Sequence, residues 1–190
     1  MTKFVRGLAL IAGLSLVGFN AVRADEESKK AQKDILEIAA DIEAGKDIAA
    51  KVAAVKKKYE DLNSLMHAYK PSEKGGIGFG PKAKGDGIEI KLNSLAKRAL
   101  TKTAIDKEKA DLVKTGYINI AIAKITDAYA PTKPKGGKTP KDWKKFTEDM
   151  EKASKSLIDA AKAGDSAALK TAATNLNSSC NNCHSDFRDS

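Results

Sequence analysis

The sequence predicts an all-α protein whose helices pack as a bundle. Apolar residues recur at intervals of three and four along several separate stretches, which is the spacing of one face of an α-helix. Short turns that end in glycine, Ala44-Gly45 and Ala163-Gly164, join four of these stretches into two hairpins. Convincing alternation of apolar and polar residues is absent from the sequence, so strands are not expected.

The first 24 residues are predicted to be a secretory signal peptide. Lys3 and Arg6 precede a short apolar run at 8–19, and Val22 and Ala24 are small residues at the offsets expected for cleavage near Ala24. An uncleaved anchor is the alternative, but the run is short and contains glycine. We therefore expect an exported, periplasmic chain of residues 25–190, long enough for one core and without a membrane span.

Two apolar stripes predict the first hairpin. The first helix should run from Ser28 to Gly45, and Asp47 can cap the second helix. The second helix is predicted to continue unbroken until Pro71. The stripes consist of Ala31, Ile35, Ile38 and Ile42, and of Ile48, Val52, Val55, Tyr59, Leu62, Met66 and Tyr69.

Apolar residues at helical spacing are less regular in the segment 71–139. Residues 71–87 are rich in glycine and lysine and predict a loop, because the run at 75–80 lacks the strand and helix that flank a phosphate-binding loop. Residues 88–129 predict one interrupted helix or two, with a polar junction near 101–106 and with Gly116 weakening the second piece. A linker of proline, glycine and lysine follows at 131–140.

The last hairpin has clear start and stop signals. Thr139 can cap a helix that has Pro140 at its first position, and Gly164 should end that helix. Asp165 or Ser166 can cap the final helix. The apolar seam of the final helix includes both cysteines of the chain, which places them toward the bundle interior. This seam consists of Leu169, Ala173, Leu176, Cys180, Cys183 and Phe187.

The final helix contains Cys180-Asn181-Asn182-Cys183-His184, which is the attachment motif of a covalent c-type haem. The two thiols can each add to a vinyl group of one porphyrin, and His184 can then bind the iron as its proximal ligand. A zinc site usually needs four such ligands, and a thioredoxin-like motif needs a βαβ context. A plain disulfide is the remaining alternative in an oxidising compartment. We expect one covalently bound haem c with its iron.

The C-terminal motif resembles that of class II c-type cytochromes, the cytochrome c-prime family. The resemblance rests on Ala163-Gly164-Asp165, on Cys180-x-x-Cys183-His184-x-x-Phe187-Arg188, on Trp143 and Phe146, and on the turn at Gly45. It implies an antiparallel four-helix bundle with haem near one end, and it makes residues 71–139 an insertion. Family members often carry an Arg-Gln pair or a methionine near the haem in the first helix. Residues 28–35 contain neither arginine nor methionine, so the usual distal residue cannot be transferred.

The sequence leaves the sixth position of the iron open. In an up-down-up-down bundle the second helix finishes at the end where the last helix finishes, and its last turn holds Met66 and His67. Met66 lies on the apolar seam and should point inward, whereas His67 lies about 100° round the helix. Four alternatives therefore remain: Met66, His67, an open apolar face, and a residue of the loop.

Two further residues are candidates for contact with the haem. Phe187 should pack against the porphyrin, because it follows Cys183 by one turn. Arg188 follows His184 by four residues and could lie near the proximal side or a propionate. The alternative for Arg188 is a solvated side chain that interacts with the helix dipole. Replacing Arg188 with alanine should shift the haem midpoint potential only in the first case.

These features predict an electron carrier rather than an enzyme. A methionine or histidine in the sixth position would favour electron transfer, and an open apolar face would favour binding of nitric oxide or carbon monoxide. A peroxide or nitrogen-oxide enzyme is a third alternative, for which the sequence offers only His67 as a distal acid or base.

The charge of the chain bears on its partners. The formal net charge is +9. Without the signal peptide and its three basic residues it is about +6, which suits an acidic redox partner. The lysines are scattered and form no basic run interleaved with aromatic residues, so nucleic-acid binding is not expected. A homodimer is implied only by the family resemblance.

Overall fold

The structure is a computed structural model that describes residues 16–80, 87–134 and 137–188, with side chains described from residue 26. The predicted signal peptide lies largely outside this description. The described ranges form seven α-helices and two short 3-10 helices. Their bounds are α1 (Leu16–Glu43), α2 (Ala49–Lys58), α3 (Asn63–Met66), η1 (His67–Tyr69), η2 (Ser72–Lys74), α4 (Ile88–Lys97), α5 (Lys102–Asp127), α6 (Pro140–Ala163) and α7 (Ser166–Phe187).

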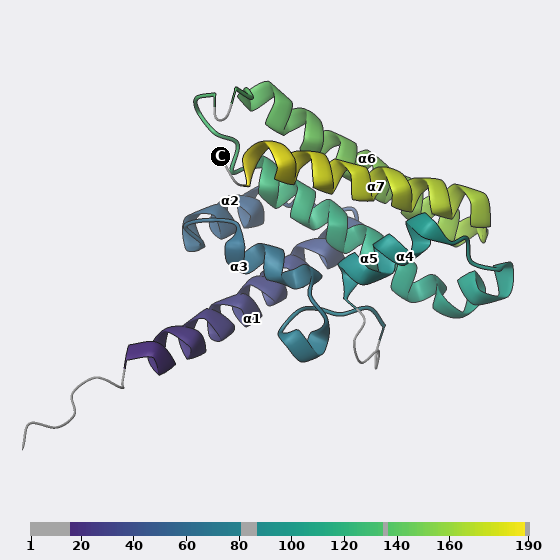
Figure 1. The fold of residues 1–190 in the computed structure, drawn as a ribbon, viewed down its shortest axis with the longest axis horizontal. Coiled ribbons are helices and arrows are strands. Elements are labelled where there is room, and N and C mark those ends of the chain that lie inside the picture. Colours follow the sequence, from purple (N-terminus) through teal and green to yellow (C-terminus); the bar gives the residue numbers. More distant parts are fainter. Residues whose placement is uncertain (1–15, 81–86, 135–136, 189–190) are drawn as a thin grey trace, which may run out of the picture.

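The helices pack as a bundle around one hydrophobic core (Figure 1). Helices α6 and α7 form a hairpin through Gly164, and α6 also packs along α5. Helix α1 packs against α5 from the opposite side of the molecule, and α4 packs against α7. The predicted all-α helical bundle is therefore confirmed.

Helix α5 occupies the central position of this bundle. Its residues 118–123 are all buried, so the helix is covered on every side for more than one turn. The sequence predicts that residues 71–139 are an insertion, which includes α5, and that residues 48–69 supply a main bundle helix. The apolar stripe ending at Tyr129 identified only one face of α5, because a helix buried all round does not produce a single stripe.

Gly116 allows α5 and α6 to approach closely. A Cβ atom at this position would lie 2.3 Å from Cγ1 of Ile158 and 3.2 Å from the backbone oxygen of Ser154. Carbon atoms in ordinary contact are about 3.5–4.0 Å apart, so only glycine fits this arrangement without a shift of α6 or a different Ile158 rotamer. The expectation that Gly116 merely weakens its helix was therefore incomplete.

The second predicted helix is broken. Helix α2 ends at Lys58, and Tyr59 adopts an extended backbone with φ −113° and ψ 127°. Its hydroxyl donates to Oδ2 of Asp34 at 2.7 Å, and its carbonyl accepts from the hydroxyl of Tyr129 at 2.8 Å. Asp61 then accepts from the amide of Asn63 at 2.8 Å and starts the short helix α3. Long-range hydrogen bonds and a local turn thus override the apolar stripe.

The ends of the last hairpin are as predicted. Thr139 and Asp142 form a capping box with Pro140 at the first helical position of α6. Gly164 ends α6 with φ 69°, which is the left-handed conformation that favours glycine. The carboxylate of Asp165 accepts from the amides of two residues in the first turn of α7, at 3.0 and 2.9 Å.

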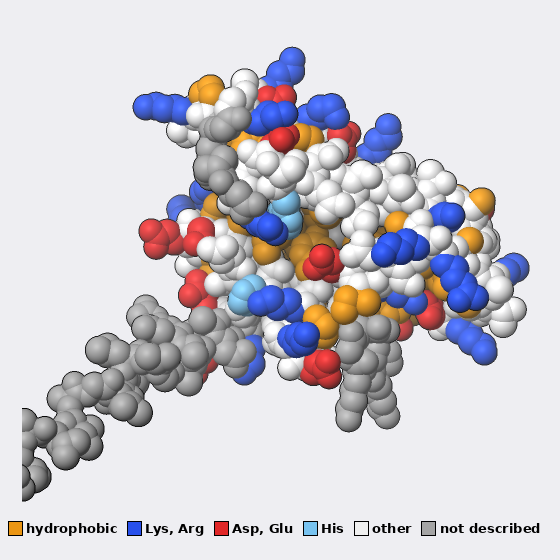
Figure 2. Space-filling view, viewed as in Figure 1, with side chains coloured by type: hydrophobic (Ala, Val, Ile, Leu, Met, Phe, Trp, Pro, Cys, Tyr) orange, Lys and Arg blue, Asp and Glu red, His pale blue; other side chains and the backbone are white. Residues whose placement is uncertain are grey.

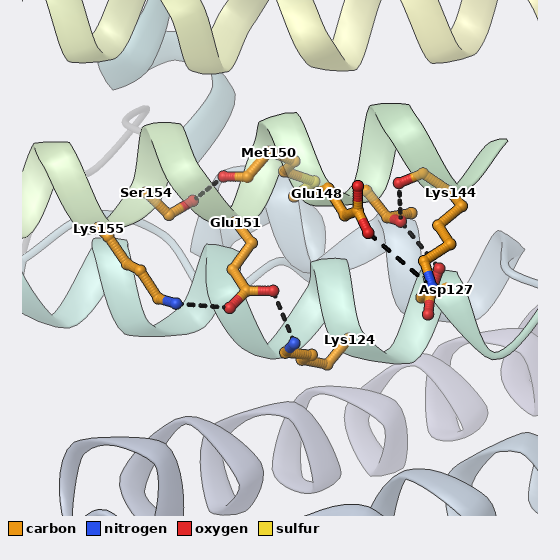
Figure 3. A network of polar contacts seen from close by, with 9 residues as sticks. Lys124, Asp127, Lys144, Glu148, Met150, Glu151, Ser154 and Lys155 are labelled. Atoms are coloured by element: carbon orange, nitrogen blue, oxygen red, sulfur yellow. Dashed lines mark hydrogen bonds and ion pairs between the residues drawn. The ribbon is translucent and has the colours of Figure 1, made fainter. Parts of the chain in front are cut away.

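A row of polar contacts lines the outer edge of the α5–α6 interface (Figure 3). Glu151 of α6 binds Lys124 of α5 at 2.6 Å and Lys155 of its own helix at 2.7 Å. The hydroxyl of Thr147 donates to Oδ1 of Asp127 at 2.9 Å. These contacts join α5 to α6 along the solvent-facing side of their apolar seam.

A helix that crosses a bilayer needs about 20 mostly apolar residues. Of the helices in the described ranges, none combines the length and the apolar character needed to cross a bilayer.

Candidate cofactor site

One face of α7 brings the sequence motif to a large cavity. The lining includes Cys180, Cys183 and His184, followed by Phe187 and Arg188 at the end of the helix. These positions follow the seam of α7, so the regular helix is what gathers them at one wall. The cavity has a volume of about 710 Å³, which is within the range typical of sites for small molecules and cofactors.

The other walls come from elements that are distant in sequence. Side chains from the α2–η1 region, from α4, and from the end of α5 and the segment after it face the cavity together with side chains of α6. Figure 2 shows hydrophobic side chains at the bottom of a hollow that lies between α7 and α3. The apolar part of these walls includes Leu62, Met66, Tyr69, Leu92, Tyr129, Trp143, Phe146 and Met150.

The structure separates the two candidates for the sixth position. Met66, at the end of α3, lines the same cavity as the two cysteines and His184. His67 is not among the described residues that line this cavity. Its Nδ1 atom instead forms a 2.9 Å hydrogen bond with the hydroxyl of Ser28 on α1, and Ser28 is buried. Burial, with a smaller contribution from Lys70, lowers the pKa of His67.

The two thiols are held in their protonated form. Both Cys180 and Cys183 are free and partly buried. Burial raises the pKa of each thiol to about 11, and the carboxylate of Asp186 adds to this effect at Cys183. The reactive thiolate is therefore scarce near neutral pH in this fold.

Aromatic side chains build the wall next to the end of α7. The rings of Trp143 and Phe187 meet edge to face with centroids 5.0 Å apart, and Phe146 lies 6.3 Å from Phe187 in a similar arrangement. The indole nitrogen of Trp143 donates to the backbone oxygen of Thr126 at 2.9 Å. This bond ties the start of α6 to the end of α5 and fixes the indole ring beside the cavity.

Sequence reasoning missed two tyrosines of the cavity wall. The hydroxyl of Tyr69 donates to Oδ1 of the fully buried Asn119 at 2.7 Å, and Asn119 donates to the backbone oxygen of Thr115 at 2.8 Å. Burial, with smaller contributions from Cys180 and Glu89, raises the pKa of Tyr69 well above its usual value, so its hydroxyl stays a donor. The sequence did offer a signal for these two residues, because two of its apolar stripes end in a tyrosine, at Tyr69 and at Tyr129.

The lining also contains charged side chains of both signs. The cations are Lys56 of α2 and Arg188, and the carboxylates are Glu60, Asp61 and Glu89. All five belong to residues with high exposure, which places the charges at the mouth of the cavity rather than at its bottom. The mouth is therefore mixed in charge and not predominantly basic.

The donor set suits a c-type haem. Two thiols three residues apart and the adjoining imidazole line one cavity, and the facing walls supply a thioether and large apolar surfaces. A porphyrin is flat and apolar with anionic carboxylates at its edge, and this cavity combines apolar walls with a mouth at which two cations lie among the charged side chains. The residues present therefore fit the group that the motif predicts.

Comparison with known proteins gave one match. A family model described as Cytochrome C' matches residues 123–188, which comprise the end of α5, both helices of the last hairpin and the cysteine motif. Comparison with curated proteins and with solved structures gave no match. The family match supports the assignment of this chain to the cytochrome c-prime family and, with it, a haem c cofactor.

Proposed function

We propose that the chain is an exported electron-transfer cytochrome that holds one haem through thioether bonds to Cys180 and Cys183. The observation that carries this proposal is the placement of both thiols and of His184 along one wall of a 710 Å³ cavity. The family match covers this wall and supports the same cofactor. When bound, haem supplies a one-electron couple at its iron, and the protein contributes burial and axial ligands.

The attachment requires both cysteines in the reduced form. Each thiol would add across a vinyl C=C bond, with its sulfur bonding one carbon and its hydrogen passing to the other. No oxidant is consumed, and a disulfide between Cys180 and Cys183 would prevent the reaction. Because burial raises the pKa of both thiols to about 11, we expect attachment to occur before the cavity closes around them.

Intact-mass measurement of the exported protein tests the attachment directly. We expect the mass of one haem on the wild-type chain, and its loss from the Cys180→Ser, Cys183→Ser double variant. A matched control is Ser178→Ala, since Ser178 is an exposed residue of the same helix and is not among the described residues that line the cavity. A wild-type chain without added mass would refute the proposal.

Met66 is our proposed sixth ligand. It lines the cavity opposite α7, whereas the ring of His67 is hydrogen-bonded to Ser28. We expect a low-spin visible spectrum for the wild type and a high-spin spectrum for Met66→Ala. His67→Ala is the matched neighbour and should retain the wild-type spectrum. The reverse pattern would assign the position to His67, and no change in either variant would mean that neither residue binds the iron.

Binding of a small gas is the second candidate function. It is favoured by the apolar side chains around Met66, among them Leu62 and Leu92, because such a face admits nitric oxide or carbon monoxide and excludes water. Carbon monoxide added to the reduced protein distinguishes the two functions. An unchanged spectrum supports electron transfer, and a rapid change at low gas concentration supports gas binding.

We further propose an acidic redox partner and a homodimer. The positive charge of the mature chain supports the first, and the rate of reduction by such a partner should fall as ionic strength rises. The three carboxylates at the cavity mouth imply that the attraction comes from lysines elsewhere on the surface. Sedimentation of the haem-loaded protein over a range of concentrations tests the dimer.

A further inference from the structure

We infer that Lys56 binds the anionic edge of the cavity's occupant, as the cation that pairs with a haem propionate. This inference rests on the proposed function, because the propionate belongs to the proposed haem. Lys56 lies in the last turn of α2, on a segment that carries no part of the cysteine motif. The contact of Lys56 with Tyr129, the free donors of its ammonium group and the pairing of other lysines of α2 support this role.

The first observation is that a long-range contact holds Lys56 at the cavity wall. Its Nζ atom lies 3.8 Å from the centroid of the Tyr129 ring, and both residues line the cavity. The ring is itself fixed, because the Tyr129 hydroxyl donates to the backbone oxygen of Tyr59 at 2.8 Å. The end of α5 is thus tied to the break after α2, and the ammonium group is placed over an anchored ring.

The second observation concerns the hydrogen-bonding capacity of the ammonium group. A cation over an aromatic face is attracted by the negative charge of the ring but makes no N–H to oxygen bond with it. An ammonium group carries three donors, so it can bind a carboxylate while it remains beside the ring. A carboxylate at the cavity edge would therefore add to the contact with Tyr129 and would not have to replace it.

The third observation is the contrast with other lysines of α2. Lys51 pairs with Asp41 of α1, and Lys58 pairs with Asp34 of α1 at 2.7 Å. Among the ion pairs of the described ranges there is none that includes Lys56, although Glu60 lies one turn away and also lines the cavity. The paired lysines join α2 to α1, and Lys56 is directed to the cavity instead.

A carboxylate next to an ammonium group is easier to ionise. An opposite charge at close range lowers a carboxyl pKa by about one unit or more, so Lys56 should hold the propionate in its anionic form at lower pH. The cation also opposes the extra positive charge of oxidised iron. Removing it should therefore lower the midpoint potential and should move the pH-dependent part of the potential to higher pH.

The test measures the midpoint potential of the haem-loaded protein between pH 5 and pH 9. The variants are Lys56→Gln, the charge-retaining Lys56→Arg, and Lys57→Gln as the matched control. Lys57 is the exposed next residue of the same helix and does not line the cavity among its described residues. The other charged and titratable side chains of the lining are common to all variants: Glu60, Asp61, Tyr69, Glu89, Tyr129, His184 and Arg188. Cys180 and Cys183 do not titrate once their sulfur atoms are bonded to the haem.

We expect Lys56→Gln to lower the potential and to move its pH-dependent range upward by about one pH unit. Lys56→Arg and Lys57→Gln should follow the wild-type curve. Equal shifts in Lys56→Gln and Lys57→Gln, or no shift in either, would overturn the role of Lys56 while leaving the haem in place. Absence of haem from the wild-type protein by intact mass would instead overturn the proposed function and this inference with it.

Discussion

Replacing Gly116 with alanine tests the packing that sets the spacing of α5 and α6. The new Cβ atom would lie 2.3 Å from Cγ1 of Ile158, which is roughly 1.2 Å short of an ordinary carbon contact of about 3.5 Å. The clashing Cγ1 atom is bonded directly to Cβ of Ile158 and is not the flexible end of the side chain. Relief therefore requires a change of the Ile158 rotamer or a shift of the whole helix.

Steric crowding and helix propensity have opposite effects on the stability of Gly116→Ala. Inserting a methyl group into a packed interface costs about 1–3 kcal/mol, and replacing glycine with alanine inside a helix contributes about 1 kcal/mol of stability. We therefore expect Gly116→Ala to lower the free energy of unfolding by about 0–2 kcal/mol. Helix propensity alone predicts that Gly116→Ala raises the free energy of unfolding by about 1 kcal/mol. The close contact and helix propensity therefore predict changes of opposite sign.

Urea denaturation followed by circular dichroism measures the difference. Lys114→Ala and Lys114→Gly at an exposed position of the same helix give the local propensity term. The background variant Ile158→Ala removes the clashing atom, and in that background Gly116→Ala should become neutral or stabilising. An increase in stability from Gly116→Ala in the wild-type background would refute the proposed close contact.

Two further predictions concern the same pair of helices. Trp143→Phe should cost about 1–2 kcal/mol of unfolding free energy, because it removes the hydrogen bond to the Thr126 carbonyl and part of a buried ring; a wild-type denaturation midpoint would contradict this. Burial raises the pKa of Glu151, but hydrogen bonds from Lys124 and Lys155 outweigh that effect and lower it overall. A lowered carboxyl pKa stabilises the fold above the ordinary value of 4.5, and this stabilisation is lost as the pH falls through the folded value. Wild type should thus be more stable than Glu151→Gln by about 0.5–1 kcal/mol near pH 7, with a gap that narrows below about pH 4.5; a gap independent of pH would refute this.

Local sequence signals predicted the helix ends and the composition of the motif wall. The capping box at Thr139, the turn at Gly164 and the cap at Asp165 depend on residues within one or two turns of each other. The same applies to the spacing that puts Cys180 and Cys183 on one face of α7. Short-range patterns of this kind are visible in a single sequence because no distant residue is needed to complete them.

The facing wall could not be predicted in the same way. A continuous apolar stripe from Ile48 to Tyr69 predicted one helix, yet Tyr59 leaves the helix to bond Asp34 and Tyr129. The break depends on partners 25 and 70 residues away, which no local pattern reveals. It also determines how the segment that carries Met66 meets the cavity.

By itself, the sequence determined that the chain is helical, where the last hairpin begins and ends, and that two cysteines and a histidine share one helix face. Only the tertiary structure decided that α5 is the central helix, that Met66 rather than His67 lines the cavity, and that Lys56 lies over Tyr129 at its wall. The physical reason is the range of the interactions. Helix turns and caps are settled by neighbours along the chain, whereas a cavity is defined by side chains that meet only after the helices have packed.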